Sequence, residues 1–408
     1  MLLTLIKNEF IKIFRRGKTW IVFALFLAFI ALTIFGTWKT DKDFRYYASP
    51  EYQIQMSEEQ LAYLERSYEE AKSSNDAQWL ESIESNIEYF TQNIEDNKYI
   101  LENGIDEDAW KAEIINEIKN VESLIADIEK EGINEYNNQQ YNYLKDNLEL
   151  LNYLNENEIE PLEGWEYHAY NFLSNTSSLF GLSLLVAGIA VFMSDIVSGE
   201  STPATLKFLL VQPVSRGKIL FSKYIVSIIT VLALIIIPEM IGMGVVNLTS
   251  DIHPSDYPVT IGQEYEKVFD SGMGEMILEE IPDTAKTITN FEYAKKIIGY
   301  QVIFIIATCS VIFMFSTLFK SSMVSMATSV ILTVFLTIGA QAISTLRKIS
   351  HLLFTTYADS ASILNSSYAL GLNNEKITIT NGLICMGITI IVTYLISHIN
   401  FTKKDILI

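Results

Sequence analysis

Six long apolar runs constrain the fold of this chain more than any other feature of its sequence, because each run can cross a lipid bilayer as one helix. A hydrocarbon core about 30 Å thick needs roughly 20 helical residues at about 1.5 Å each. The predicted spans are residues 19–38, 172–193, 224–246, 297–319, 323–346 and 379–399. The sequence therefore predicts an all-α polytopic membrane protein with six transmembrane helices. An even number of spans puts both termini on one side of the membrane.

The acidity of the chain is concentrated between the first two spans, in residues 39–171. The whole chain carries a formal net charge of −20. Residues 41–164 alone hold 31 acidic against 9 basic side chains, whereas the rest of the chain holds 18 against 20. Because strong net charge keeps a protein segment in water, we expect a soluble domain here, outside the membrane.

Apolar residues in this acidic segment recur every three or four positions, which is typical of helices that bury one narrow seam. A capping-box pattern begins at Ser57, and Gly104 and Gly132 are expected helix stops. The seam residues are Leu80, Ile83, Ile87, Phe90, Ile94, Trp110, Ile114, Ile118, Val121, Ile125, Ile128, Tyr141, Leu144, Leu148 and Leu151. The spacing predicts an inserted extracellular α-helical domain of coiled-coil-like hairpins. Its acidic surface either attracts a cationic ligand or only keeps the domain soluble.

Basic residues beside the spans predict the orientation, because Lys and Arg are enriched in cytoplasmic segments. The side that carries both termini has twelve bases against four acids, and the opposite side has eight bases. We therefore expect both termini in the cytoplasm, with an amphipathic interfacial helix on membrane lipid at residues 1–18. The remaining segments are a cytoplasmic loop at 194–223, a cytoplasmic tail at 400–408, and extracellular parts at 39–171, 247–296 and 347–378.

The 194–223 loop carries the most distinctive motif of the chain. Pro203 suits the first turn of a short helix, where its missing N–H is not needed, and Pro213 ends that helix. Between the two prolines lies a compact apolar surface beside Lys207. Such a surface favours docking on a partner, and a helix lying on lipid headgroups is the alternative.

Several residues of this loop resemble the cytoplasmic-loop pattern of type 2 ABC exporter permeases. The matching residues are Glu200, Thr205, Leu206, Lys207, Pro213, Val214, Ser215, Arg216 and Lys223, with Ala204 where the family usually has Gly. The resemblance implies a coupling helix that docks on a separate cytosolic ATPase subunit. The coupling residues that it implies are Glu200, Thr205, Leu206, Lys207, Pro213 and Arg216.

The resemblance also implies the function, which is that of the permease subunit of an ATP-driven exporter in the bacterial plasma membrane. Such permeases pair with a second copy or a paralogue, and residues 347–378 resemble the re-entrant or interfacial helices that precede the last span. ATP and Mg²⁺ would belong to the partner, because this chain has no G-x-x-x-x-G-K-[ST] loop. It also lacks hydrolase and zinc-protease motifs, so we expect no catalytic residue, metal or cofactor in it, and no nucleic-acid partner.

One acidic residue lies inside a predicted span. Glu239 follows Pro238 in the third span, and a carboxylate at membrane depth costs about 2.5–3.5 kcal/mol on insertion scales unless it faces a cavity or a partner. It either lines a pathway for a cationic substrate or reaches the outer headgroups. Gln301 in the fourth span is a second candidate pathway residue, although polar residues in spans more often pack between helices.

A competing function is a membrane-anchored sensor or scaffold whose extracellular helical domain binds a ligand or a partner. The paired prolines and the P-V-S-R stretch of the loop favour the permease, because a scaffold does not need them. The sequence does not name a substrate, and ions, peptides, lipids and drugs all fit it.

Overall fold

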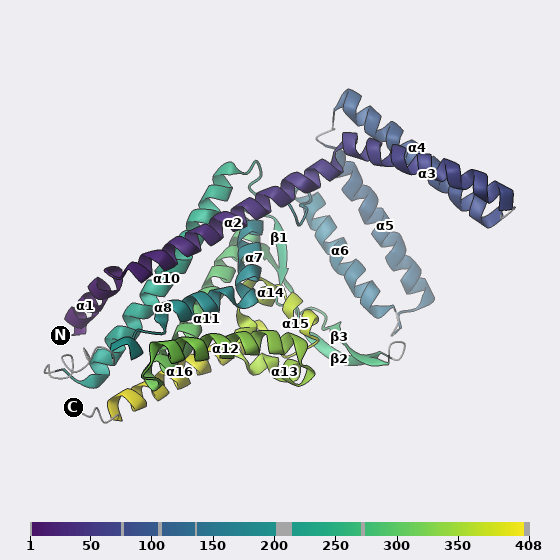
Figure 1. The fold of residues 1–408 in the computed structure, drawn as a ribbon. Helices are drawn as coiled ribbons and strands as arrows, with labels where there is room; N and C mark the ends of the chain where they lie inside the picture. The colour runs from purple at the N-terminus through teal and green to yellow at the C-terminus, as the bar shows by residue number, and fades with distance from the viewer. Residues whose placement is uncertain are drawn as a thin grey trace. The chain divides into compact units, whose positions relative to one another are not determined.

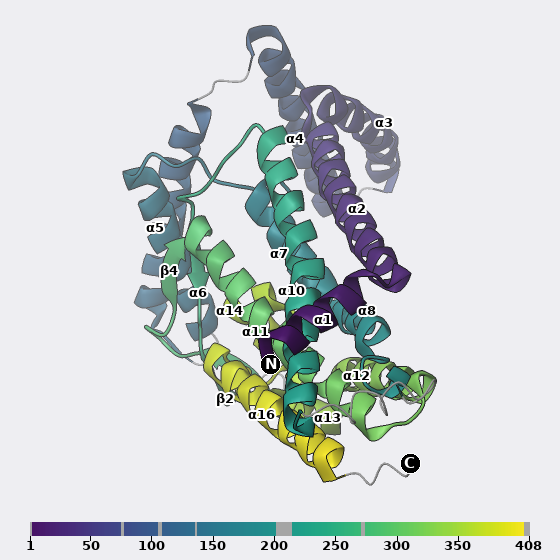
Figure 2. The same cartoon turned by 90° about the vertical axis from the view of Figure 1, so that its left-hand side faces the viewer.

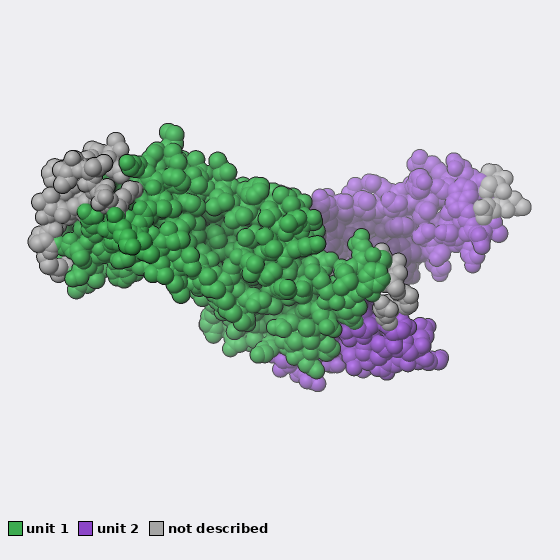
Figure 3. All heavy atoms as spheres, turned by 90° about the horizontal axis from the view of Figure 1, so that it is seen from below, with its two compact units in different colours: residues 1–35, 168–408 green, residues 36–167 purple. Residues whose placement is uncertain are grey.

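The computed structural model describes residues 2–74, 77–104, 108–134, 137–200, 214–270 and 274–403. The chain divides into two compact units (Figure 3). Unit 1 comprises residues 1–35 and 168–408, and unit 2 comprises residues 36–167.

Long apolar helices dominate unit 1 (Figure 1). Within the described residues, five helices are long and apolar enough to cross a membrane. They are α2 (Gly17–Ala48), α10 (Arg216–Thr249), α11 (Asn290–Leu318), α12 (Ser322–Ala342) and α16 (Ile379–Lys403). A sixth span is obtained if a bent pair counts as one. The two arms of this pair are Ala169–Leu182 and Leu185–Glu200, and the angle between them is 63°. They include α7 (Ala169–Leu179), the π-helical turn η1 (Phe180–Leu184) and α8 (Leu185–Met193).

The bend in the second apolar run lies against the chain around Asp359. Gly181 lies in the π-helical turn, and a Cβ at this position would lie only 2.7 Å from the Cβ of Asp359. One turn earlier, the Ser177 hydroxyl contacts the Asp359 carboxylate at 3.3 Å and accepts from the Ala361 N–H at 3.0 Å. The chain around Asp359 thus packs directly against the bend, which local hydropathy does not reveal.

Helix α11 forms the centre of unit 1. It packs against α7, α8, α10, α12 and α16 (Figure 2). Two thirds of its most apolar stretch is buried. Phe304, Ile305, Ile312 and Phe313 of α11 are fully buried in the main hydrophobic core. The other long helices are less covered, so they leave broad apolar faces for lipid or for a partner.

The expectation of an all-α protein is wrong, because residues 258–289 contain four short strands. Strand β1 (Pro258–Ile261) pairs antiparallel with β4 (Lys286–Thr289), and β2 (Tyr265–Asp270) pairs antiparallel with β3 (Glu275–Glu280). Strands β2, β3 and β4 combine β-branched or aromatic residues with charged ones, whereas β1 has the sequence PVTI and no charge. Ile261, Tyr265 and Leu278 are buried. The acidic residues of β2 and β3 concealed these two strands. The fold is mostly helical rather than all helical.

Short helices connect α12 to α16. They are α13 (Ser344–Ile349), η3 (Ser350–Leu352), η4 (Phe354–Tyr357), α14 (Ser360–Leu364) and α15 (Ser367–Leu372). Tyr357 of η4 is fully buried, and a Cβ at Gly382 of α16 would lie 2.6 Å from its ring. This segment is therefore part of the core of unit 1.

Unit 2 consists mainly of helices that pair as hairpins. Helix α3 (Pro50–Ser74) packs against α4 (Ala77–Asn103), and α5 (Ala109–Glu131) packs against α6 (Asn138–Glu156). The α5–α6 pair buries the residues that the spacing marked as a seam, which are Val121, Ile125, Ile128, Leu144 and Leu151. Gly104 and Gly132 follow the ends of α4 and α5 with positive φ values of 84° and 90°, as their expected role in stopping a helix requires.

The predicted capping box at Ser57 is wrong. Helix α3 already begins at Pro50, so Ser57 lies inside it, and its buried hydroxyl contacts the Asn93 side-chain oxygen on α4 at 3.0 Å. A proline at the first helical position provides the start instead.

Candidate functional site

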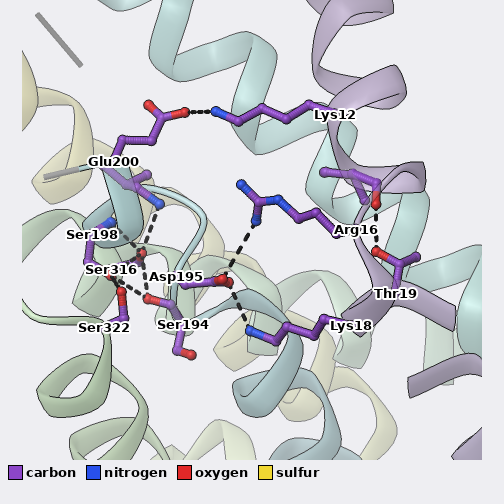
Figure 4. A network of polar contacts seen from close by, with 12 residues as sticks. Lys12, Arg16, Lys18, Thr19, Ser194, Asp195, Ser198, Glu200, Ser316 and Ser322 are labelled. Carbon is purple, nitrogen blue, oxygen red and sulfur yellow. Dashed lines mark hydrogen bonds and ion pairs between the residues drawn. The ribbon is translucent and has the colours of Figure 1, made fainter. Parts of the chain in front are cut away.

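Helix α1 (Leu2–Phe14) packs on α10 and presents its polar residues to the beginning of the 194–223 loop. Thr19 fixes the corner between α1 and α2, because its buried hydroxyl donates to the Ile13 carbonyl at 2.7 Å. This corner points Lys12, Arg16 and Lys18 toward the loop (Figure 4).

The most buried charged group at this place is the cluster of Glu9, Lys12, Glu200 and Lys223, hereafter the Glu200 cluster. Glu200 ends the short helix η2 (Ser198–Glu200), and only 2% of it is exposed. The Lys223 ammonium of α10 donates to Glu200 Oε1 at 2.7 Å and to Glu9 Oε1 at 2.9 Å. Lys12 of α1 forms a second ion pair with Glu200 (Figure 4).

The Glu200 cluster carries two positive and two negative side chains, so its formal charges balance. This balance makes the burial of Lys223 feasible, because an ammonium in a protein interior needs paired and hydrogen-bonded charges. Removing one partner of such a buried group typically costs about 3–5 kcal/mol, since the other charge stays behind without compensation. The cluster thus joins α1, the loop entrance and α10.

A second, more exposed group lies beside it. Asp195, just after α8, pairs with Lys18 at 2.9 Å and with Arg16 at 3.6 Å (Figure 4). These side chains are each about one third exposed, and pairs of this kind contribute at most about 1 kcal/mol. They connect the α1–α2 corner with the end of α8.

Serine hydroxyls attach the loop entrance to α11 and α12. The Ser316 hydroxyl near the end of α11 accepts from the Val197 and Ser198 N–H groups at 3.1 and 3.2 Å, and donates to the Ser194 carbonyl at 2.9 Å. Ser198 also reaches Ser322 at the start of α12, at 3.1 Å (Figure 4). All backbone groups in these contacts are buried, so the loop leaves the membrane part along a fixed path.

The loop exit is attached to α16. Arg216, the first residue of α10, donates to the Thr402 carbonyl at 3.5 Å. Gly217 lies against the His398 ring, where a Cβ would approach a ring carbon to 2.8 Å. Both ends of the loop are therefore tied to the helical core of unit 1.

The structure brings only part of the predicted coupling residues together. Glu200 and Arg216 lie at the entrance and the exit of the loop, whereas Thr205, Leu206, Lys207 and Pro213 lie outside the described residues. The sequence did not indicate that Lys223 is buried, nor that Glu9 and Lys12 share the cluster with it. The available signal was the small number of acidic residues on this face, since Glu9 and Glu200 are two of only four acids counted against twelve bases there.

The two predicted pathway residues lie deeper in the membrane part. Glu239 of α10 is fully buried and Gln301 of α11 is 1% exposed. Glu239 therefore does not reach the surface of the protein at the outer headgroups. Counted along α10, it lies sixteen residues, or about 24 Å, from Lys223.

Other chemistry is limited in the described part of the chain, which contains no group of three or more His, Cys, Asp or Glu arranged to hold a metal ion. His168 has a structural role instead, because its Nδ1 accepts from the Asn171 N–H at 3.2 Å and caps α7. Burial lowers the pKa of His168 to about 4, so the ring is neutral near pH 7.

Comparison with known proteins identifies one family. The family model described as ABC-2 family transporter protein matches residues 3–406, which is nearly the whole chain. The resemblance found in the 194–223 loop is thereby confirmed. No match was found among the curated proteins or among the solved structures.

Proposed function

Because the chain belongs to the ABC-2 family of transporter membrane proteins, we propose that it couples a separate cytosolic ATPase to the export of a substrate across the bacterial plasma membrane. Members of this family are multi-pass transmembrane subunits without catalytic activity of their own. ATP and Mg²⁺ act in the partner subunit. The permease works as a dimer, with a second copy or a paralogue.

The observation that carries this proposal is the attachment of the 194–223 loop to the core. A docking element transmits force only if its two ends move with the spans. The entrance is held by the Glu200 cluster and by Ser316, and the exit is held through Arg216. A displacement of the loop is thereby passed to α1, α10, α11 and α16 at once.

The docking surface itself is the loop between the two prolines. Leu206 and its apolar neighbours provide the contact area together with Thr205, and Lys207 and Arg216 provide charges for an acidic edge on the ATPase. From the sequence pattern, Pro213 is expected to end the docking helix. Glu200 holds the base of the loop through its ion pairs, so that closing of the ATPase pair on ATP rocks the spans between access states.

The orientation follows from the same residues. Arg16, Lys18 and the Lys12 of the Glu200 cluster lie on the face that carries the loop, and the positive-inside tendency places this face in the cytoplasm. Both termini then lie in the cytoplasm, and the acidic unit 2 lies outside the cell. Unit 2 offers a negatively charged surface there, which either attracts a cationic ligand or only keeps the unit soluble.

The test is a pull-down of the tagged chain from its native cells in mild detergent, with ATPase activity measured in the eluate. The double variant Lys207→Glu/Arg216→Glu should lose most of the ATPase, because both charges at the docking edge are reversed. The matched control Lys98→Glu/Lys119→Glu makes the same charge change at exposed positions of α4 and α5 and should retain it.

Two results would contradict the proposal. Full co-purification of the ATPase with the Lys207/Arg216 variant would refute the docking assignment. A wild-type chain recovered without any ATPase would refute the coupled permease and favour the anchored sensor.

A further inference from the structure

Glu239 and Gln301 form a buried polar pair without hydrogen-bond partners in the middle of unit 1. Both Glu239 carboxylate oxygens, and both the oxygen and the nitrogen of the Gln301 amide, are buried without a partner among the residues that the structure describes. Gln301 approaches the Glu239 carboxyl from α11, but no hydrogen bond of normal geometry joins them. Buried polar groups almost always find a partner, so this pair needs an explanation.

The backbone beside the pair adds another acceptor. Pro238 lies inside α10 and has no N–H, so the carbonyl of Leu234 lacks its usual helical donor. Together with the carboxylate and the amide oxygen, the place offers hydrogen-bond acceptors and a negative charge. Gln301 supplies the only donor group of the pair. This composition suits a ligand group that carries positive charge, which the carboxylate and the carbonyl oxygens attract.

The packing around the pair indicates how a ligand would enter. Gly242 lies one turn beyond Glu239 on the same side of α10, and a Cβ there would lie 2.6 Å from Ile30 of α2 and 2.7 Å from Phe172 of α7. Ile30 of α2 and Phe172 of α7 thus pack against α10 one turn from Glu239. A movement of these helices would change access to the pair.

We propose that Glu239 and Gln301 bind the cationic group of the transported substrate, an ammonium or another organic cation. The inference rests on the proposed function, since it names the substrate class of the same transporter. When the neighbouring helices move, the Glu239 carboxylate faces the cation and the Gln301 amide oxygen points the negative end of its dipole toward it. Such a role accounts for a carboxylate kept at membrane depth despite its insertion cost.

The test compares two probes of the same shape and opposite charge on the full-length chain in lipid nanodiscs. Tetraphenylphosphonium should bind to the wild type, and tetraphenylborate should not bind specifically. Glu239→Gln should weaken tetraphenylphosphonium binding about thirtyfold or more, the scale for removing one partner of a buried charge pair. The exchange variant Glu239→Gln/Gln301→Glu returns the carboxylate from the opposite helix and should regain much of the lost affinity.

The control Met240→Gln places an amide at the same depth on the exposed side of α10, and should leave binding unchanged. Equal affinity for tetraphenylphosphonium in the wild type and in Glu239→Gln would overturn the proposal. So would a wild type that binds neither probe, because Glu239 would then be a neutral acid that pairs with Gln301 on its own. Co-purification of the ATPase distinguishes failure of the cation-site proposal from failure of the coupled-permease proposal. The Glu239 variants should still co-purify with the ATPase. A wild-type chain that does not co-purify with an ATPase would refute only the coupled permease.

Discussion

Two carboxylates of unit 1 are equally buried but differ in their surroundings. Glu200 at the loop entrance is 2% exposed and contacts two lysines, whereas Glu239 inside α10 is fully buried and has no ion-pair or hydrogen-bond partner among the described residues. A buried charge with partners from other elements holds those elements together. A buried charge without partners lowers stability and is retained for another purpose, usually function. The comparison thus distinguishes a structural ion cluster, which includes Lys223 of α10, from a candidate ligand site that includes Glu239 farther along the same helix.

The largest effect expected from this comparison is the loss of the Glu200 side chain. Glu200→Ala leaves Lys223 buried with only Glu9 as partner, and frees Lys12. We expect the free energy of unfolding to fall by about 3–5 kcal/mol, measured by denaturation of the purified protein in detergent. Asp195→Ala is the matched control, because its two pairs are partly exposed and should contribute less than about 1 kcal/mol. Equal losses in both variants would mean that the Glu200 cluster does not hold the loop entrance.

His168 differs from both carboxylates, because it is a buried titratable group that is neutral and accepts a hydrogen bond from the Asn171 N–H. Its pKa of about 4 lies below the ordinary value near 6.5 because burial disfavours the charged ring. Between these two values the unfolded chain binds more protons than the folded one, so stability is present above pH 6.5 and is lost as the pH falls toward 4. The expected slope approaches about 1.4 kcal/mol per pH unit.

Thermal unfolding of the wild type and of His168→Asn between pH 7 and pH 4 measures this contribution. Asn keeps an oxygen that can cap α7 but does not titrate, so the variant should show a smaller decrease. Parallel curves would show that the His168 ring is accessible to protons in the folded protein.

Hydropathy and helical spacing predicted much of the fold, because both are local properties of the sequence. The apolar runs correspond to five candidate spanning helices or to six with the bent pair, and the seam from Val121 to Leu151 is buried between α5 and α6. The four strands were missed because each is at most six residues long and lies in a loop rich in prolines and acidic residues. The bend at Phe180–Leu184 was missed because hydropathy does not reveal that Asp359, far away in the sequence, packs against it.

The candidate site could be predicted only in part, for a similar reason. The motif singled out Glu200 and Arg216 as coupling residues, but Lys12 lies 188 residues from Glu200 in the sequence. No local pattern indicates which of many lysines is brought to a given carboxylate, since tertiary packing decides it. The depth of Glu239 was readable, because one carboxylate in an apolar run of this length is conspicuous.

The smallest expected change in stability is also the sharpest test of the comparison. Glu239→Gln replaces a buried carboxyl group that has no hydrogen-bond partner within the described residues by an amide of the same shape that can pair with Gln301. Its free energy of unfolding should therefore equal that of the wild type or exceed it slightly, under the same conditions in which Glu200→Ala loses about 3–5 kcal/mol. If Glu239→Gln were destabilised as strongly, Glu239 would be a structural residue with a partner, and the reason to place a substrate cation beside it would disappear. If Glu239→Gln is as stable as the wild type but binds the cation more weakly, the buried carboxyl group is retained for transport and not for stability.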